Sequence, residues 1–283
     1  MQSLKQIKNR IRSVENTKKV TGAMQMISVS KLNRIQDSLF VLRPYASKLE
    51  NFMQNLARSC REDLSAYFQE SSRGAGSVLV LVTSDSGLCG MYNQNVLRAA
   101  EEFLKKNKDR DPALILVGQK GLNYFKSSSR RILSSYAGLN GKFKQEFCDR
   151  LTGEITDLFL SGRAGEIHLA YTYFENSLFQ KPLIERFLPV RQRLVKPVDY
   201  IVEPDLKSIL AEIIPRYLRV KMQLILMESF TSEHAARIVS MKTATDNAKD
   251  LLVRLVLFRN KMRQAGITQD ILEISSSAEA LRG

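Results

Sequence analysis

The 283-residue sequence has no tryptophan, only two histidines and only three cysteines. Cys60, Cys89 and Cys148 form neither a CxxC motif nor a Cys/His ligand spacing, so we expect no disulfide framework and no zinc site. No run of eighteen apolar residues occurs, so the chain is not expected to span a membrane by itself. The amino terminus is amphipathic and lacks the apolar core of a signal peptide, which favours mature structure there.

Negative charge is scarce relative to positive charge. Lys and Arg number 43 against 29 Asp and Glu, which gives a formal net charge of +14. This excess suits a nucleic acid, an anionic membrane or an acidic protein, and charge alone does not choose among them. The basic N-terminal segment has few aromatic side chains to stack on bases. A nucleic-acid-binding coiled coil therefore stays an alternative, to be recognised by a steep salt dependence.

Apolar residues recur every 3.5 residues near both ends of the chain. The C-terminal seam runs from Leu206 to Ile274 and the N-terminal seam from Leu4 to Leu56. Such a repeat over many heptads is typical of supercoiled helices. One helix enters the intervening segment and the other leaves it. The sequence therefore predicts an antiparallel two-helix coiled coil formed by the termini, with the longer C-terminal helix projecting beyond the pair.

The N-terminal seam is polar at four consecutive positions. These are Lys18, Thr21, Gln25 and Ser28. Each missing leucine-sized contact forgoes about 1.5 to 3 kcal/mol of burial. Two interpretations stay open: a locally hydrated coiled coil, or a segment that faces another partner or must be able to untwist.

Strand and helix patterns alternate between the two seams. We expect strands at 77–83, 113–117 and 168–174, an edge strand near 184–190, and helices at 93–106, 122–125 and 143–160. This alternation predicts a small Rossmann-like α/β domain with a mostly parallel sheet. The predicted organisation is an N-terminal coiled-coil helix at 1–58, an α/β domain at 77–195 and a C-terminal coiled-coil helix at 205–283.

The loop SDSGLCG at 84–90 occupies the strand-to-helix position where doubly wound sheets bind phosphates, but it matches neither GxGxxG nor GxxxxGK[ST]. A tight turn explains its glycines. Cys89 would need a neighbouring base to act as a nucleophile, and neither histidine has a Cys/His spacing to it. We interpret His168 as a packed core residue and His234 as a helix-interface residue. No catalytic, cofactor-binding or metal-binding residue is predicted, and a small enzyme built on this loop stays the second alternative.

Four segments resemble the gamma subunit of F-type ATP synthases. They are LKQIKNRIRSVENTKKVTGAMQMISVSKL (4–32), VTSDSGLCGMYN (82–93), ESFTSEHAARIVSMKTATDNAKDLL (228–252) and NKMRQAGITQDILEI (260–274). The resemblance is specific at both ends and at the glycine loop, and weak from about 110 to 190. Positions that depart from the family pattern are Gly22, Ser86, Gly266 and Ser277.

The resemblance implies a non-catalytic rotor shaft. Such a shaft couples ion-driven rotation of a membrane ring to conformational cycling of the catalytic alpha/beta hexamer, for ATP synthesis or hydrolysis. The implied partners are the alpha and beta subunits, the epsilon subunit and the membrane c-ring, with one copy per complex and no nucleic acid or cofactor. No redox insertion with paired cysteines and no separable transit peptide is recognised, which favours a peripheral position on the cytoplasmic face of a bacterial membrane.

The resemblance also implies two sets of contact residues. Positions matching the family's contacts with the catalytic subunits hold Met24, Lys31, Arg263, Gln264, Thr268 and Asp270. The segment that meets the ring and the epsilon subunit in the family holds Tyr200 and Glu203.

Overall fold

The computed structural model describes residues 4–59, 65–69, 76–191 and 205–280. The chain divides into two compact units, Ser28–Val239 and the combination of Met1–Ile27 with Ser240–Gly283. Helices α1 (Leu4–Ser59) and α6 (Leu206–Ala280) contribute residues to both units. No helix in the described ranges is long and apolar enough to cross a bilayer.

A five-stranded sheet forms the centre of the 28–239 unit, in the order β3-β2-β1-β4-β5. All neighbouring strands are parallel except β4 and β5, which pair antiparallel. The strands are β1 (Ser77–Val82), β2 (Ala113–Val117), β3 (Ile132–Tyr136), β4 (Glu166–Phe174) and β5 (Gln180–Leu188). The predicted mostly parallel sheet is confirmed.

Strand β3 was not predicted from the sequence. Its sequence ILSSY places Ser134 and Ser135 where a buried strand would carry apolar residues, and its side chains are mostly half-buried. Because β3 lies at the edge of the sheet, it needs little apolar surface. An edge strand of this kind leaves no apolar run for sequence analysis to find.

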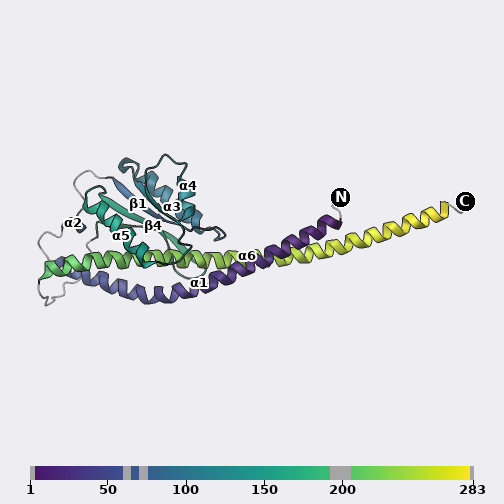
Figure 1. The fold of residues 1–283 in the computed structure, drawn as a ribbon, viewed down its shortest axis with the longest axis horizontal. Helices are drawn as coiled ribbons and strands as arrows, with labels where there is room; N and C mark the ends of the chain where they lie inside the picture. Colours follow the sequence, from purple (N-terminus) through teal and green to yellow (C-terminus); the bar gives the residue numbers. More distant parts are fainter. Residues whose placement is uncertain (1–3, 60–64, 70–75, 192–204, 281–283) are drawn as a thin grey trace. The chain divides into compact units, whose positions relative to one another are not determined.

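Helices cover both faces of the sheet (Figure 1). Val78 and Val80 of β1 pack with α5 (Gln145–Leu160) and with the parts of α1 and α6 in this unit. The alternate residues Leu79 and Leu81 pack with α3 (Tyr92–Lys106) and α4 (Gln119–Phe125). The alternation follows from the period of two along a strand. The shorter helices are α2 (Ser65–Phe68) and the 3₁₀ turn η1 (Lys108–Arg110).

The predicted N-terminal seam is buried along α1 in this unit. Its buried positions are Leu32, Ile35, Leu39, Ala46, Met53 and Leu56. Arg43, which lies beside the seam, forms an ion pair with Glu228 of α6 at 2.7 Å. The helix continues through Pro44, and α6 likewise continues through Pro215. The periodicity thus located the face of α1 that packs on the rest of the chain.

The second unit is an antiparallel pair formed by the ends of α1 and α6. Ile7 and Ile11 pack in one apolar cluster with Leu255, while Thr21 is hydrogen-bonded to Thr245, Oγ1 to Oγ1, at 2.7 Å. As the residue number increases along α1, the number of the facing residue on α6 decreases, so the two helices run antiparallel. From 263 to 278 every side chain is exposed except at Gly266. This agrees with the predicted projection of the longer helix.

Two of the four polar positions at the centre of the α1 seam are buried. Thr21 is 8% exposed and Ser28 is 2% exposed, while Lys18 and Gln25 are half-buried. Thr21 finds its partner on α6, which satisfies its hydroxyl without water. Thr21 therefore faces α6 and not another protein, while Ser28 is buried within the 28–239 unit.

Candidate functional site

The glycine loop 84–90 turns carbonyl groups, not amides, toward helix α6. Arg237 donates from Nη2 to the Ser86 carbonyl at 3.4 Å and to Ser86 Oγ at 3.0 Å, and from Nε to the Gly87 carbonyl at 3.3 Å. A phosphate site needs the opposite polarity, with backbone N–H groups converging on the anion. The arginine of the chain itself occupies this position, so the geometry argues against a nucleotide there.

Two side chains of α6 itself also contact the Arg237 guanidinium. Nη2 lies 2.8 Å from Glu233 Oε1, and Nη1 lies 3.3 Å from His234 Nδ1. Burial raises the pKa of Glu233, and the charge of Arg237 acts in the opposite direction. All three side chains are buried.

His234 links this cluster to the loop that follows β3. Its Nε2 lies 3.0 Å from the Gly141 carbonyl, so Nε2 carries the proton and Nδ1 accepts from Arg237. Burial lowers the pKa of His234 to about 4. The imidazole is therefore neutral near pH 7. The structure places His234 at the interface between α6 and the sheet, as predicted for a helix-interface residue.

Asp85 ties together the loops at the carboxyl ends of three strands. Its carboxylate accepts from the backbone N–H groups of Gln119 and Gly138 at 3.0 Å and of Asn140 at 2.6 Å. The Lys31 ammonium of α1 donates to the Asn140 carbonyl at 3.1 Å. We refer to Lys31, Asp85, Glu233, His234 and Arg237 together as the carboxyl-edge cluster. Sequence analysis missed all of it except Lys31 and His234, because its members come from distant parts of the chain.

Cys89 lies inside the loop and has no base beside it. The thiol is 2% exposed, accepts from Asn93 Nδ2 at 3.2 Å and lies 3.8 Å from Ser84 Oγ. Burial raises its pKa. Both ring nitrogens of His234 are engaged elsewhere. This environment is that of a structural thiol and not of an activated nucleophile.

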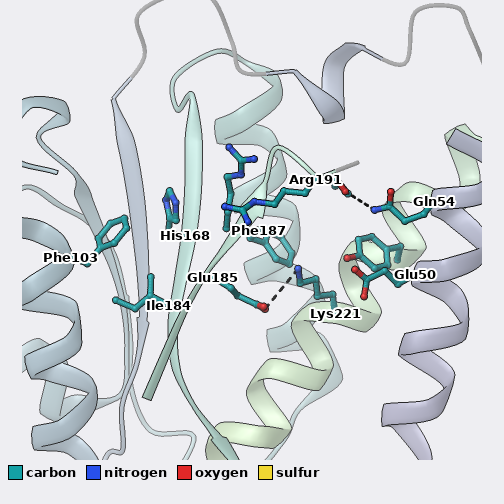
Figure 2. A pocket seen from close by; sticks show the side chains of 12 residues that line it. Glu50, Gln54, Phe103, His168, Ile184, Glu185, Phe187, Arg191 and Lys221 are labelled. Carbon is teal, nitrogen blue, oxygen red and sulfur yellow. Dashed lines mark hydrogen bonds and ion pairs between the residues drawn. The ribbon is translucent and has the colours of Figure 1, made fainter. Parts of the chain in front are cut away.

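A cavity of about 520 Å³ lies at the end of β5, away from the carboxyl-edge cluster. Figure 2 shows Phe103, His168 and Ile184 on one side of it and Glu50, Gln54 and Lys221 on the other. His168 is half-buried with its ring 4.7 Å from that of Phe103, so it lines a cavity wall and is not the fully packed residue we predicted.

Charged groups of both signs line this cavity. Lys221 Nζ lies 3.8 Å from the Glu185 carboxylate, and Gln54 donates to the Arg191 carbonyl at 2.6 Å. Arg186 lies 3.5 Å from Glu166. No cluster of metal-ligating side chains occurs among the described residues. The cavity has the size of a ligand pocket but not a set of charges converging on one kind of ligand.

The residues predicted to contact catalytic subunits differ in exposure. Arg263, Gln264, Thr268 and Asp270 are exposed on α6, whereas Met24 is half-buried on α1 within the same unit. Lys31, in the other unit, is half-buried and donates to Asn140. Tyr200 and Glu203 lie outside the described residues.

Exposed apolar side chains accompany them on both helices of the unit formed by 1–27 and 240–283, which we call the paired-end unit. On α1, Val20 is 58%, Met26 76% and Ile27 57% exposed. On α6 beyond residue 262, the exposed large apolar residues are Ile267, Ile271, Leu272 and Ile274. The spacing of 267, 271 and 274 places three of them on one face of the helix. The signal that sequence analysis missed on α1 was apolar residues outside the seam positions, which indicate a second apolar face.

Comparison with known proteins assigns the family. A model of the ATP synthase family matches residues 3–281. The ATP synthase gamma chains of Anaeromyxobacter sp. (strain K) and Protochlamydia amoebophila (strain UWE25) are each 37% identical to this chain, over 290 and 286 residues, with complete coverage of both sequences in each pair.

Solved structures share the fold. A central stalk chain of the Tetrahymena thermophila mitochondrial ATP synthase aligns with a TM-score of 0.61 at 21% identity, over 80% of this chain and 99% of that one. A chain of the Euglena gracilis mitochondrial ATP synthase aligns with a TM-score of 0.58 at 17% identity, over 92% and 95%. The chain belongs to the ATP synthase family, among the gamma chains.

Proposed function

We propose that this subunit is the central rotor shaft of an ATP synthase. It couples ion-driven rotation of a membrane ring to conformational cycling of a catalytic alpha/beta hexamer, in synthesis or in hydrolysis. The observation that carries the proposal is the α6 segment from 263 to 278, which is helical and exposed on all sides in a chain of the gamma family. A helix this exposed gains stability from a surrounding partner.

The exposed segment suits a rotating contact. Ile267, Ile271 and Ile274 offer apolar surface on one face, and apolar attraction has no directional requirement. Because this face differs from the rest of the helix, each catalytic subunit meets a different surface at each angle of the shaft. Only such differential contact can bias the open and closed states of otherwise equal subunits.

Polar residues of this segment supply the specific contacts in the proposal. Arg263, Gln264, Thr268 and Asp270 bind the catalytic subunits, together with Met24 on α1. Thr268 Oγ1 donates to the backbone carbonyl of Gln264 in its own helix, so this hydroxyl keeps only its acceptor capacity for a partner. Lys31 joins these contacts with less freedom, since its ammonium donates to Asn140.

The partners follow from the same role. The shaft has one copy per complex, meets the alpha and beta subunits along its helices, and meets the epsilon subunit and the c-ring through the segment that holds Tyr200 and Glu203. It sits peripherally on the cytoplasmic face of the membrane. Catalysis belongs to the hexamer in this proposal, and the glycine loop of this chain instead accepts hydrogen bonds from Arg237.

Reconstitution tests the proposal. The alpha and beta subunits, epsilon subunit and membrane sector are assembled in vesicles with and without this chain, and ATP hydrolysis and ATP-driven ion uptake are measured. We expect ion uptake only when the chain is present. Equal uptake per ATP without the chain would refute the shaft role.

A further inference from the structure

The carboxyl-edge cluster and the neighbouring Ser229–Tyr92 pair join the sheet domain to α6. Ser229 Oγ is 2.7 Å from the Tyr92 hydroxyl, His234 reaches the Gly141 carbonyl, and Arg237 reaches Ser86. From Ser229 to Arg237 the helix rises about 12 Å. Together these three contacts hold roughly two turns of α6, from the start of α3 and from the loops that follow β1 and β3.

These contacts differ in kind from the apolar packing beside them. Apolar attraction depends on buried area and has no preferred direction; its resistance to sliding comes from the interdigitation of close-packed side chains. A hydrogen bond weakens steeply once its donor–acceptor distance leaves the range of about 2.7 to 3.2 Å. The Arg237 contact with Ser86 Oγ at 3.0 Å lies within this range, so a displacement of about 1 Å around the helix weakens it steeply, while the two carbonyl contacts at 3.3 and 3.4 Å are longer. The cluster thus adds contacts with a required direction to an interface that is otherwise apolar.

The neighbours of Arg237 fix the orientation of its guanidinium. Glu233 and His234 hold the guanidinium from the helix side, while Ser86 and Gly87 accept from it on the loop side. Because the planar group is fixed before it meets the loop, little rotamer freedom remains to soften the contact. Asp85 in turn fixes the loop by three backbone hydrogen bonds.

We propose that Arg237 is a positioning residue that locks the sheet domain onto the shaft helix against rotation, so that torque applied to the sheet passes into α6 without slip. This inference rests on the shaft role proposed above. Doubly wound α/β sheets commonly bind ligands in the crevice at the carboxyl ends of their strands. In this chain Arg237 of α6 occupies that crevice, and the contact serves as a mechanical joint.

The test compares ATP hydrolysis with ATP-driven ion uptake by the complete reconstituted complex. Arg237→Met keeps the length and helix propensity of the side chain but removes the grip on Ser86 and Gly87. Because it leaves Glu233 buried without its cation, the double variant Glu233→Gln/Arg237→Met is measured beside it; replacing a buried ion pair by neutral groups often preserves stability. The matched control is Arg219→Met, since Arg219 is an exposed arginine of α6 whose guanidinium donates to the Pro215 carbonyl of its own helix.

We expect both Arg237 variants to assemble and hydrolyse ATP while moving fewer ions per ATP, and the control to match the wild type. Ion uptake per ATP equal to wild type in the double variant would overturn the proposal, because Arg237 would then serve only to neutralise Glu233. Failure of both variants to assemble would overturn it as well, since the cluster would be a folding determinant. If the wild-type complex pumps ions normally, the shaft role holds, and either of these results then counts against the Arg237 proposal alone.

Discussion

The paired-end unit depends on few buried apolar residues, so truncating one of their side chains should lower its stability markedly. Ile7 is 1% exposed and packs in a cluster with Ile11 and Leu255. Ile7→Ala removes three carbon atoms from this site. At about 0.8 kcal/mol for each buried carbon, and with a further cost for the cavity that remains, we expect a loss of about 3 kcal/mol. Val20→Ala, at a side chain 58% exposed, should cost no more than about 0.5 kcal/mol.

Hydrogen exchange of the purified chain measures this loss where it occurs. Because 1–27 and 240–283 form a unit of their own, their amides can open without unfolding of the sheet. In Ile7→Ala we expect faster exchange in peptides from these segments and unchanged exchange in β1 and β4. The reasoning would be refuted if Val20→Ala accelerated exchange as much as Ile7→Ala, since burial on the seam would then not be the source of stability.

Further predictions concern the exposed helix, the buried histidine and two glycines. Arg263→Ala with Gln264→Ala should lower ion uptake per ATP without changing the unfolding midpoint of the chain, because both side chains are exposed. Burial lowers the pKa of His234 to about 4 from 6.5, so its contribution to stability is complete above pH 6.5 and is lost as the pH falls toward 4. We therefore expect the free energy of unfolding of the wild type to fall more steeply between pH 6.5 and 4 than that of His234→Gln, measured by denaturant titration at each pH. At Gly22 and Gly266 an added Cβ meets no atom within 4 Å, so alanine at either position should raise the free energy of unfolding by about 1 kcal/mol in denaturant titrations.

Periodicity carried most of what the sequence could predict about the fold. A repeat of 3.5 residues fixes one face of a helix, and the seam from Ile7 to Leu56 coincides with the buried or half-buried face of α1. Period alone does not say what a polar seam position faces. Thr21 was for that reason open to two interpretations until Thr245 was found opposite it.

The functional residues also fall into two groups, those that the sequence could predict and those that only the structure shows. Arg263 and Gln264 could be proposed from the resemblance because they lie in one continuous motif. The carboxyl-edge cluster could not, because Ser86, Gly141 and Arg237 are brought together only by the fold of the sheet against α6. Polar contacts between residues so distant in sequence leave no periodic signal.

Direct observation of rotation tests the shaft role most sharply. The alpha/beta hexamer is fixed to a surface, and a probe is attached to this chain at a cysteine introduced at Asp109, an exposed position of η1. With ATP we expect the probe to rotate continuously in one direction. A probe that stays at one angle while the same complexes hydrolyse ATP would contradict the account.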